Sequence, residues 1–130
     1  MKSNLVINVV GLSPSMIGQH TPNLLELSKK GGMKPLDTVI PAVTCSVQST
    51  LLTGLLPNDH GIVANGWFFK NLSEVLFWRQ PNQLVKGEKI WEKGKKINSK
   101  FTCAKMFWWY NMYSTADWSA TPVSYTHLRA

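Results

Sequence analysis

The residues with the clearest chemical potential lie between Ile40 and Asn65. Thr44 follows a strand-like stretch and stands at the opening of a predicted helix, 45–52. Unpaired backbone N–H groups and the positive end of the helix dipole meet at such a point, which suits a phosphate oxyanion. A threonine hydroxyl there attacks phosphorus if a metal lowers its pKa. The alternative is that Thr44 only caps the helix.

Other reactive side chains give weaker signals. Cys45 is a competing nucleophile in principle, but no basic partner is evident, and a packed thiol is the simpler interpretation. Cys45 and Cys103 form no CxxC pair and predict neither a disulfide framework nor a thiolate zinc site. The acidic and histidine side chains considered as metal ligands lack ligand spacing; they are Asp37, Asp59, Asp117, His20, His60 and His127.

Charge and aromatic content suggest a second hypothesis from a different class. The net charge is +7, and six of the 14 basic residues fall between Lys86 and Lys100, around Trp91. This run predicts either a solvated helix face or a basic module that binds anions or nucleic acid. The aromatic stretch 105–113 is interpreted as core, with stacking on a flat group such as a nucleobase as its alternative.

The surrounding elements alternate in type. The predicted order is a strand at 5–10, a helix of about ten residues after Thr21-Pro22, a strand at 33–40 and the helix 45–52, followed by a turn-rich connection at 57–61. A hairpin of 67–69 and 75–78, a helix at 88–96 and a strand at 101–108 with alternating side chains complete the pattern. This alternation predicts an α/β fold with a mostly parallel sheet.

Length and composition limit the class further. The chain has 130 residues, of which 44% are hydrophobic, as expected for one globular domain or part of one. No apolar run reaches the roughly 18 residues of a membrane-spanning helix, and no secretory signal is apparent. We therefore expect a cytoplasmic protein that does not cross a membrane.

Several fixed spacings resemble the type I phosphodiesterase and nucleotide pyrophosphatase family of the alkaline phosphatase superfamily. The motifs that carry the resemblance run from Leu5 through Asn65: the opening strand, Thr21-Pro22-Asn23-Leu24 with Leu27, Pro41-x-x-Thr44, Leu52-Thr53-Gly54-Leu55 with Pro57, His60-Gly61-Ile62 and Asn65. The resemblance implies an alkaline-phosphatase-like sandwich, of which residues 1–122 are the N-terminal portion, with a mostly parallel sheet flanked by helices.

The resemblance also implies a mechanism and a substrate class. Thr44 matches the nucleophile, which binds one of two zinc ions and forms a phosphoryl-enzyme intermediate. Asn65 matches the asparagine whose amide, together with the backbone N–H of the nucleophile, holds a phosphate oxygen; taken alone, Asn65 before Gly66 is a turn-forming residue. The implied substrate is a small-molecule phosphate ester or nucleotide, and nucleic acid is not the expected partner. His60 matches an element that is usually structural.

The sequence departs from the family pattern in three ways. Val10 stands where the family has an aspartate that ligates zinc, and an apolar side chain cannot replace it. An alternative function is therefore a non-catalytic relative that keeps the fold but has lost metal binding. Cys45-Ser46-Val47 stands in place of Phe-Pro-Asn. In the family the remaining zinc ligands, an Asp-x-x-x-His element and a further Asp-His pair, lie well past the part that this sequence matches, so we expect this stretch alone to be inactive. Residues 123–130 resemble a translated sequencing adapter, and we expect a non-native tail there.

Overall fold

The computed structural model describes residues 3–122, which fall into two compact units, Met1–Asp37 and Thr38–Ala130. The expected non-native tail, 123–130, lies outside the described residues. Among the described residues, no helix combines the length and the apolar content needed to cross a membrane.

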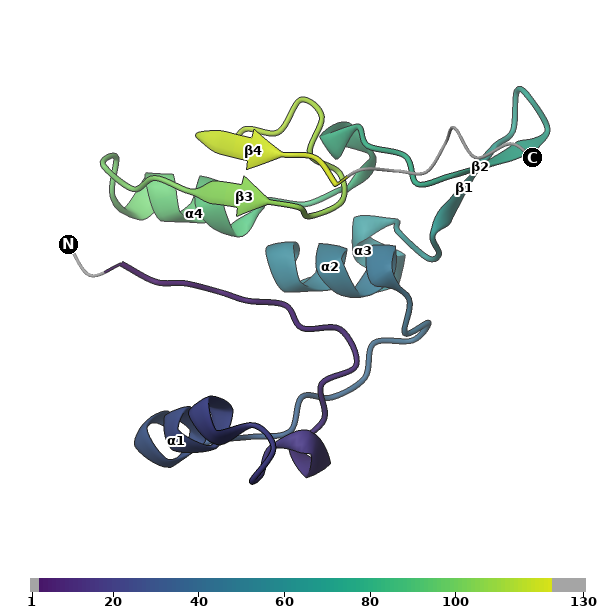
Figure 1. Ribbon diagram of the computed structural model, residues 1–130. Coiled ribbons are helices and arrows are strands. Elements are labelled where there is room, and N and C mark those ends of the chain that lie inside the picture. Colours follow the sequence, from purple (N-terminus) through teal and green to yellow (C-terminus); the bar gives the residue numbers. More distant parts are fainter. Residues whose placement is uncertain (1–2, 123–130) are drawn as a thin grey trace. The chain divides into compact units, whose positions relative to one another are not determined.

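The N-terminal unit contains one regular helix (Figure 1). After a 3-10 turn, η1 (Pro14–Met16), helix α1 spans Pro22–Gly31. The prediction of a helix after Thr21-Pro22 is confirmed, because proline supplies a helical φ at the first position, where no N–H is needed. Thr21 connects the start of α1 to the preceding turn, because its hydroxyl accepts the Gly18 N–H at 2.9 Å and donates to the Met16 carbonyl at 3.0 Å.

The predictions of strands at 5–10 and 33–40 are wrong. Residues 5–10 are extended but form no strand, with Leu5 84% and Val10 81% exposed, and residues 33–40 also form none. The pattern at 5–10 is typical of a strand buried on both faces, and such a strand exists only where neighbours accept its hydrogen bonds. Residues 3–122 provide no such neighbours.

The second unit contains the remaining elements (Figure 1). They are α2 (Thr44–Thr53), α3 (Pro57–His60), β1 (Gly66–Phe69), β2 (Glu74–Phe77), η2 (Asn82–Leu84), α4 (Ile90–Ile97), β3 (Ala104–Met106) and β4 (Trp118–Ala120). The helices predicted at 45–52 and 88–96 and the hairpin at 67–78 are confirmed within one or two residues. The connection at 57–61 is a short helix, and only the middle of the strand predicted at 101–108 is a strand.

The sheets are small and separate. β1 and β2 pair antiparallel, with Phe68 opposite Val75, whereas β3 and β4 pair parallel, with Lys105 opposite Ser119. The α/β class is therefore confirmed in its coarse form. A mostly parallel sheet is not found in residues 3–122, because the two predicted strands that would have joined it remain unpaired.

The core of the second unit forms around α2. One buried apolar cluster contains Cys45, Ile62, Val85 and Tyr110, with Trp67, Leu84 and Trp109 packed against it. Trp91, on α4, is buried separately from this cluster. The buried face of α2 is itself mostly polar, since Ser46, Gln48, Ser49 and Thr53 join Cys45 there. The first turn of α2 is thus held by both packing and hydrogen bonds.

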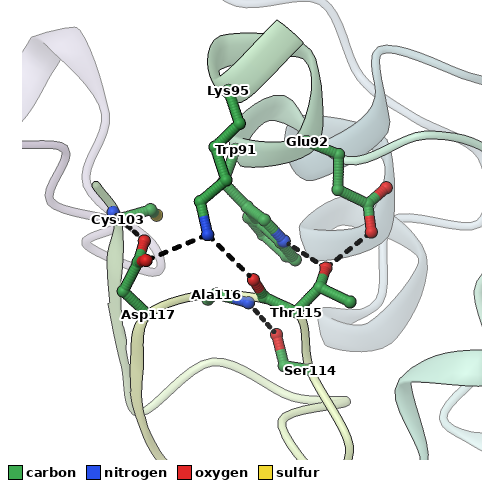
Figure 2. Close-up of polar contacts among 8 residues, drawn as sticks. All are labelled: Trp91, Glu92, Lys95, Cys103, Ser114, Thr115, Ala116 and Asp117. Atoms are coloured by element: carbon green, nitrogen blue, oxygen red, sulfur yellow. Dashed lines mark hydrogen bonds and ion pairs between the residues drawn. The ribbon is translucent and has the colours of Figure 1, made fainter. Parts of the chain in front are cut away.

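A polar network joins α4 to the loop before β4 (Figure 2). The Trp91 indole N–H donates to the Thr115 hydroxyl at 2.8 Å, and that hydroxyl donates to Glu92 at 2.6 Å. On the next turn of α4, Lys95 forms an ion pair with Asp117 at 2.9 Å, and the second Asp117 oxygen accepts the Cys103 N–H at 2.8 Å. These bonds fix α4 beside β3 and β4.

Gly94 lets a ring lie against α4. A Cβ at this position would come within 2.8 Å of two carbon atoms of the Phe101 ring. Gly94→Ala normally adds about 1 kcal/mol to helix stability, but here we expect it to lower the free energy of unfolding by roughly 1–2 kcal/mol. Urea unfolding followed by tryptophan fluorescence measures this. In a Phe101→Ala background, Gly94→Ala should raise the free energy of unfolding. If Gly94→Ala raises it with Phe101 intact, the close contact between Gly94 and the Phe101 ring is contradicted.

Candidate functional site

The candidate site begins at the N-terminus of α2. The N-cap residue is Val43, whose side chain makes no capping bond, and Thr44 is the first helical residue. The hypothesis that Thr44 caps the helix is therefore wrong. The Thr44 side chain is half-buried, and its hydroxyl makes no hydrogen bond to the described residues. It lies beside first-turn N–H groups, which the helix itself cannot pair.

Asn65 reaches the same helix end from another part of the chain. The Cys45 N–H donates to Asn65 Oδ1 at 3.0 Å, so the carboxamide lies beside the residue that follows Thr44. The Asn65 backbone is fixed by the hairpin, since it directly precedes β1 and its carbonyl accepts the Trp78 N–H at 3.1 Å. The structure thus brings together the two residues that the sequence singled out.

This hydrogen bond also sets the orientation of the Asn65 amide. A backbone N–H can only donate, so the amide oxygen must face Cys45. The amide nitrogen, with its two N–H bonds, is left to donate to another group. Together with the unpaired N–H groups and the dipole of α2, it makes a set of donors suited to an anion.

His60 is a structural residue that packs against the C-terminal half of α2. It is fully buried; its Nδ1 accepts the Ile62 N–H at 3.1 Å and its Nε2 lies 3.0 Å from the Thr50 hydroxyl. Burial lowers the pKa of His60, although Asp59 opposes this. Because both ring nitrogens are engaged, the side chain links α2 to α3 and is not free to ligate a metal.

Comparison with known proteins is informative at this point. The sequence matches the model of the family described as type I phosphodiesterase / nucleotide pyrophosphatase over residues 4–129, nearly the whole chain. The chain belongs to this family. It is also 36% identical over 78 residues to an uncharacterized pyrophosphatase/phosphodiesterase of Schizosaccharomyces pombe. That match covers 59% of this chain but 16% of the relative. No solved structure matches the chain.

The described residues of this phosphodiesterase-family chain do not fit a metal site. Within residues 3–122, no group of three or more His, Cys, Asp or Glu side chains is placed to hold an ion. Asp117 is already bonded to Lys95 and to the Cys103 N–H. Val10, at the position where the family resemblance expects an aspartate, belongs to the N-terminal unit and is exposed. We therefore derive no step of the reaction through zinc.

The basic run 86–100 is partly used by the fold itself. Lys89 is buried and donates to the Val85 carbonyl at 2.8 Å, Lys95 pairs with Asp117, and Lys96 pairs with Glu88 at 2.6 Å. Figure 2 shows Lys95 reaching over to the β4 side of the network. Half of the six lysines are thus directed at groups of the chain, and no specific observation favours a nucleic-acid surface.

Cys45 is a packed thiol. It is fully buried, and burial raises the pKa of the thiol, although the Tyr110 hydroxyl opposes this. We expect iodoacetamide to modify the partly exposed Cys103 in the folded protein and Cys45 only after unfolding. Peptide mass spectrometry at increasing urea concentrations measures both rates. Modification of Cys45 in native buffer, as fast as in the unfolded chain, would contradict its burial.

Four residues near the site were not singled out in the sequence, although Lys105 and Tyr110 belong to the stretch 105–113, for which stacking on a flat group was the alternative. Gln48 lies on α2, and Trp78 directly follows β2. Lys105 donates to the Tyr110 carbonyl at 2.9 Å, and Tyr110 packs with Cys45 of α2. The alternation at 101–106 does hold, because Phe101, Cys103 and Lys105 are less exposed than their neighbours. That pattern was the only sequence signal that set Lys105 apart from the surface lysines.

Proposed function

We propose that this chain carries the nucleophile of a phosphoric ester hydrolase, with Thr44 attacking the phosphorus of a small-molecule phosphodiester or nucleotide. The observation that supports the proposal best is the 3.0 Å hydrogen bond between the Cys45 N–H and Asn65 Oδ1. It supports the proposal because it joins Asn65 to the residue that follows Thr44, and the proposed phosphoryl group would contact both side chains at this helix N-terminus.

In the first step, the Thr44 oxygen forms a bond to phosphorus while the bond to the leaving oxygen breaks. The Thr44 proton passes to water, and the leaving oxygen takes a proton from water and departs as an alcohol or a phosphate. The other ester group stays on phosphorus. In the second step, water attacks the esterified phosphothreonine, restores the hydroxyl and releases a phosphate monoester.

The neighbouring donors act on the charge that develops during both steps. Negative charge grows on the non-bridging oxygens as phosphorus becomes five-coordinate. The Asn65 amide N–H and the first-turn N–H groups of α2 donate to such an oxygen, and they are already oriented by the Cys45 contact. Fixed donors of this kind stabilise a transition state without reorganisation, typically by about 3–4 kcal/mol for each donor.

Zinc remains a prediction for the intact protein, with Thr44 as the one ligand that the family resemblance assigns within this sequence. The prediction that residues 1–130 alone are inactive also stands as a proposal. The curated relative is several times longer than the matched segment, since the match covers 16% of it. The experiments below therefore use the intact protein.

Trapping the covalent intermediate tests the proposal directly. The intact protein is mixed with bis(4-nitrophenyl) phosphate, quenched in acid within one turnover and digested for mass spectrometry. We expect a nitrophenyl phosphoryl group on the peptide that contains Thr44, and on the serine of a Thr44→Ser variant. Turnover with the group on another residue would refute Thr44 as nucleophile, and absence of both turnover and adduct would favour a non-catalytic relative.

A further inference from the structure

A segment about 60 residues further along the chain packs against the helix that carries Thr44. Gln48 Oε1, on α2, accepts the Trp109 N–H at 2.9 Å, across 61 positions of sequence. The next residue, Tyr110, is buried and packs in the core with Cys45, and its hydroxyl influences the pKa of the thiol. Cys45 and Gln48 are three positions apart and share one face of α2. The segment thus contacts two points on the helix.

The same segment also contacts the hairpin end that carries Asn65. The Trp109 ring stacks on the Trp78 ring with centroids 4.7 Å apart and an angle of 29° between the planes. The Trp78 N–H donates to the Asn65 carbonyl at 3.1 Å. Trp109 and Tyr110 therefore lie against both halves of the proposed site, the Thr44 half and the Asn65 half.

Lys105 holds these two residues in place. Its ammonium donates to the Trp109 carbonyl and to the Tyr110 carbonyl, each at 2.9 Å, and the Asn82 amide donates to the Tyr110 carbonyl as well. The Tyr110 φ is +59°, a left-handed conformation that a tyrosine rarely adopts. The converging donors hold a backbone shape that would otherwise be unfavourable.

The surroundings of Lys105 give no reason to expect that its ammonium group stabilises the fold. The residue is 3% exposed, and its hydrogen bonds go only to carbonyl oxygens, with the Trp91 ring 5.4 Å away. Burial lowers the pKa of Lys105 to about 8, Lys89 adds to this, and Cys103 opposes it. A buried ammonium without a counter-charge is costly, and an apolar side chain of similar length would avoid that cost. What the ammonium adds is the fixed direction of two carbonyls.

We propose that residues 105–110 form a brace for the phosphate site, in which Lys105 and Tyr110 are positioning residues that set the N-terminus of α2 against Asn65. The inference rests on the proposed role of Thr44. Among the described residues, neither side chain forms a hydrogen bond to Thr44 or Asn65. Their effect is exerted through Cys45, Gln48 and Trp78.

Tyr110→Phe removes one oxygen atom and is the mildest test. In the intact protein we expect kcat for bis(4-nitrophenyl) phosphate to fall about 10-fold with KM changed by less than about twofold, because a small displacement of the nucleophile affects the chemical step more than binding. The matched control is Tyr113→Phe, at a 71% exposed tyrosine in the same segment. It should leave both constants unchanged.

Hydrogen exchange gives a readout that does not depend on activity. The Cys45 N–H is bonded to Asn65 in the wild-type protein, and we expect its exchange to be about 10-fold faster in Tyr110→Phe. Lys105→Met should act in the same direction, with Lys100→Met, at an exposed lysine, as control. The double variant should be no worse than the worse single variant, because both residues act through one path.

The outcomes separate this inference from the proposed function. The brace is overturned if the Cys45 N–H of Tyr110→Phe exchanges at the wild-type rate. It is also overturned if Tyr113→Phe loses as much kcat as Tyr110→Phe. If Thr44→Ala retains turnover, the proposed function fails and the kcat comparison loses its meaning. The exchange of Cys45 then still decides whether the segment holds α2 against Asn65.

Discussion

Thr44→Ala is expected to lower kcat for bis(4-nitrophenyl) phosphate at least about 10⁴-fold in the intact protein, because no other hydroxyl occupies the first position of α2. The substitution should leave the fold unchanged. Thr44 is half-buried and makes no hydrogen bond to the described residues, so the free energy of unfolding should change by less than about 0.5 kcal/mol.

Steady-state kinetics and urea unfolding together measure this result. Thr102→Ala is a suitable control, since it makes the same change at an exposed threonine away from α2. Thr44→Ser should keep a measurable fraction of turnover because it keeps a hydroxyl. Full turnover by the alanine variant would remove Thr44 from the mechanism, whereas equal loss in Thr102→Ala would point to a general effect on folding.

Asn65→Asp is expected to separate the structural role of Asn65 from its chemical role. An aspartate oxygen accepts the Cys45 N–H as the amide oxygen does, and a carboxylate at a helix N-terminus is favourable by about 0.3–1 kcal/mol. The thermal midpoint should therefore be unchanged or slightly higher. The second carboxylate oxygen, however, replaces a donor with a negative charge facing the substrate, so kcat/KM should fall about 10²–10³-fold.

Calorimetry and initial-rate kinetics on the same preparations test this pair of expectations. Asn65→Ala is the matched variant, because it removes both the Cys45 contact and the donor and should lose stability as well as activity. Retained kcat/KM in Asn65→Asp would exclude the amide as a phosphate donor. A large loss of stability in the aspartate variant would instead show that the Cys45 contact is not made as described.

Elements with local signals were predictable from the sequence. Pro22 marks the start of α1, and Gly54, with φ +72°, ends α2 in a left-handed conformation that suits glycine. The two aromatic runs joined by a polar turn gave the β1–β2 hairpin. The family spacings point to Thr44 and Asn65, and the hydrogen bond from the Cys45 N–H to Asn65 Oδ1 joins Asn65 to the residue that follows Thr44. Their chemical roles stay a proposal.

Elements that depend on distant partners were not predictable. Whether residues 5–10 form a strand depends on neighbours that must lie beside them, and a pattern of side chains cannot supply those neighbours. The bond from Trp109 to Gln48 spans 61 positions and has no local signature. For Lys105 the alternation at 101–106 indicated an inward position, but the partners of its ammonium were not predictable, because they are backbone carbonyl oxygens.

The extended segment at residues 5–10 has a consequence for handling the isolated chain. It is an uncharged stretch without proline, rich in β-branched residues, and Leu5, Val6 and Ile7 are each more than 70% exposed. Stretches of this length and composition stack readily into cross-β fibrils when their backbone groups are unpaired. Solutions of residues 1–130 should therefore develop thioflavin T fluorescence on standing, and a lysine at Ile7 should delay it.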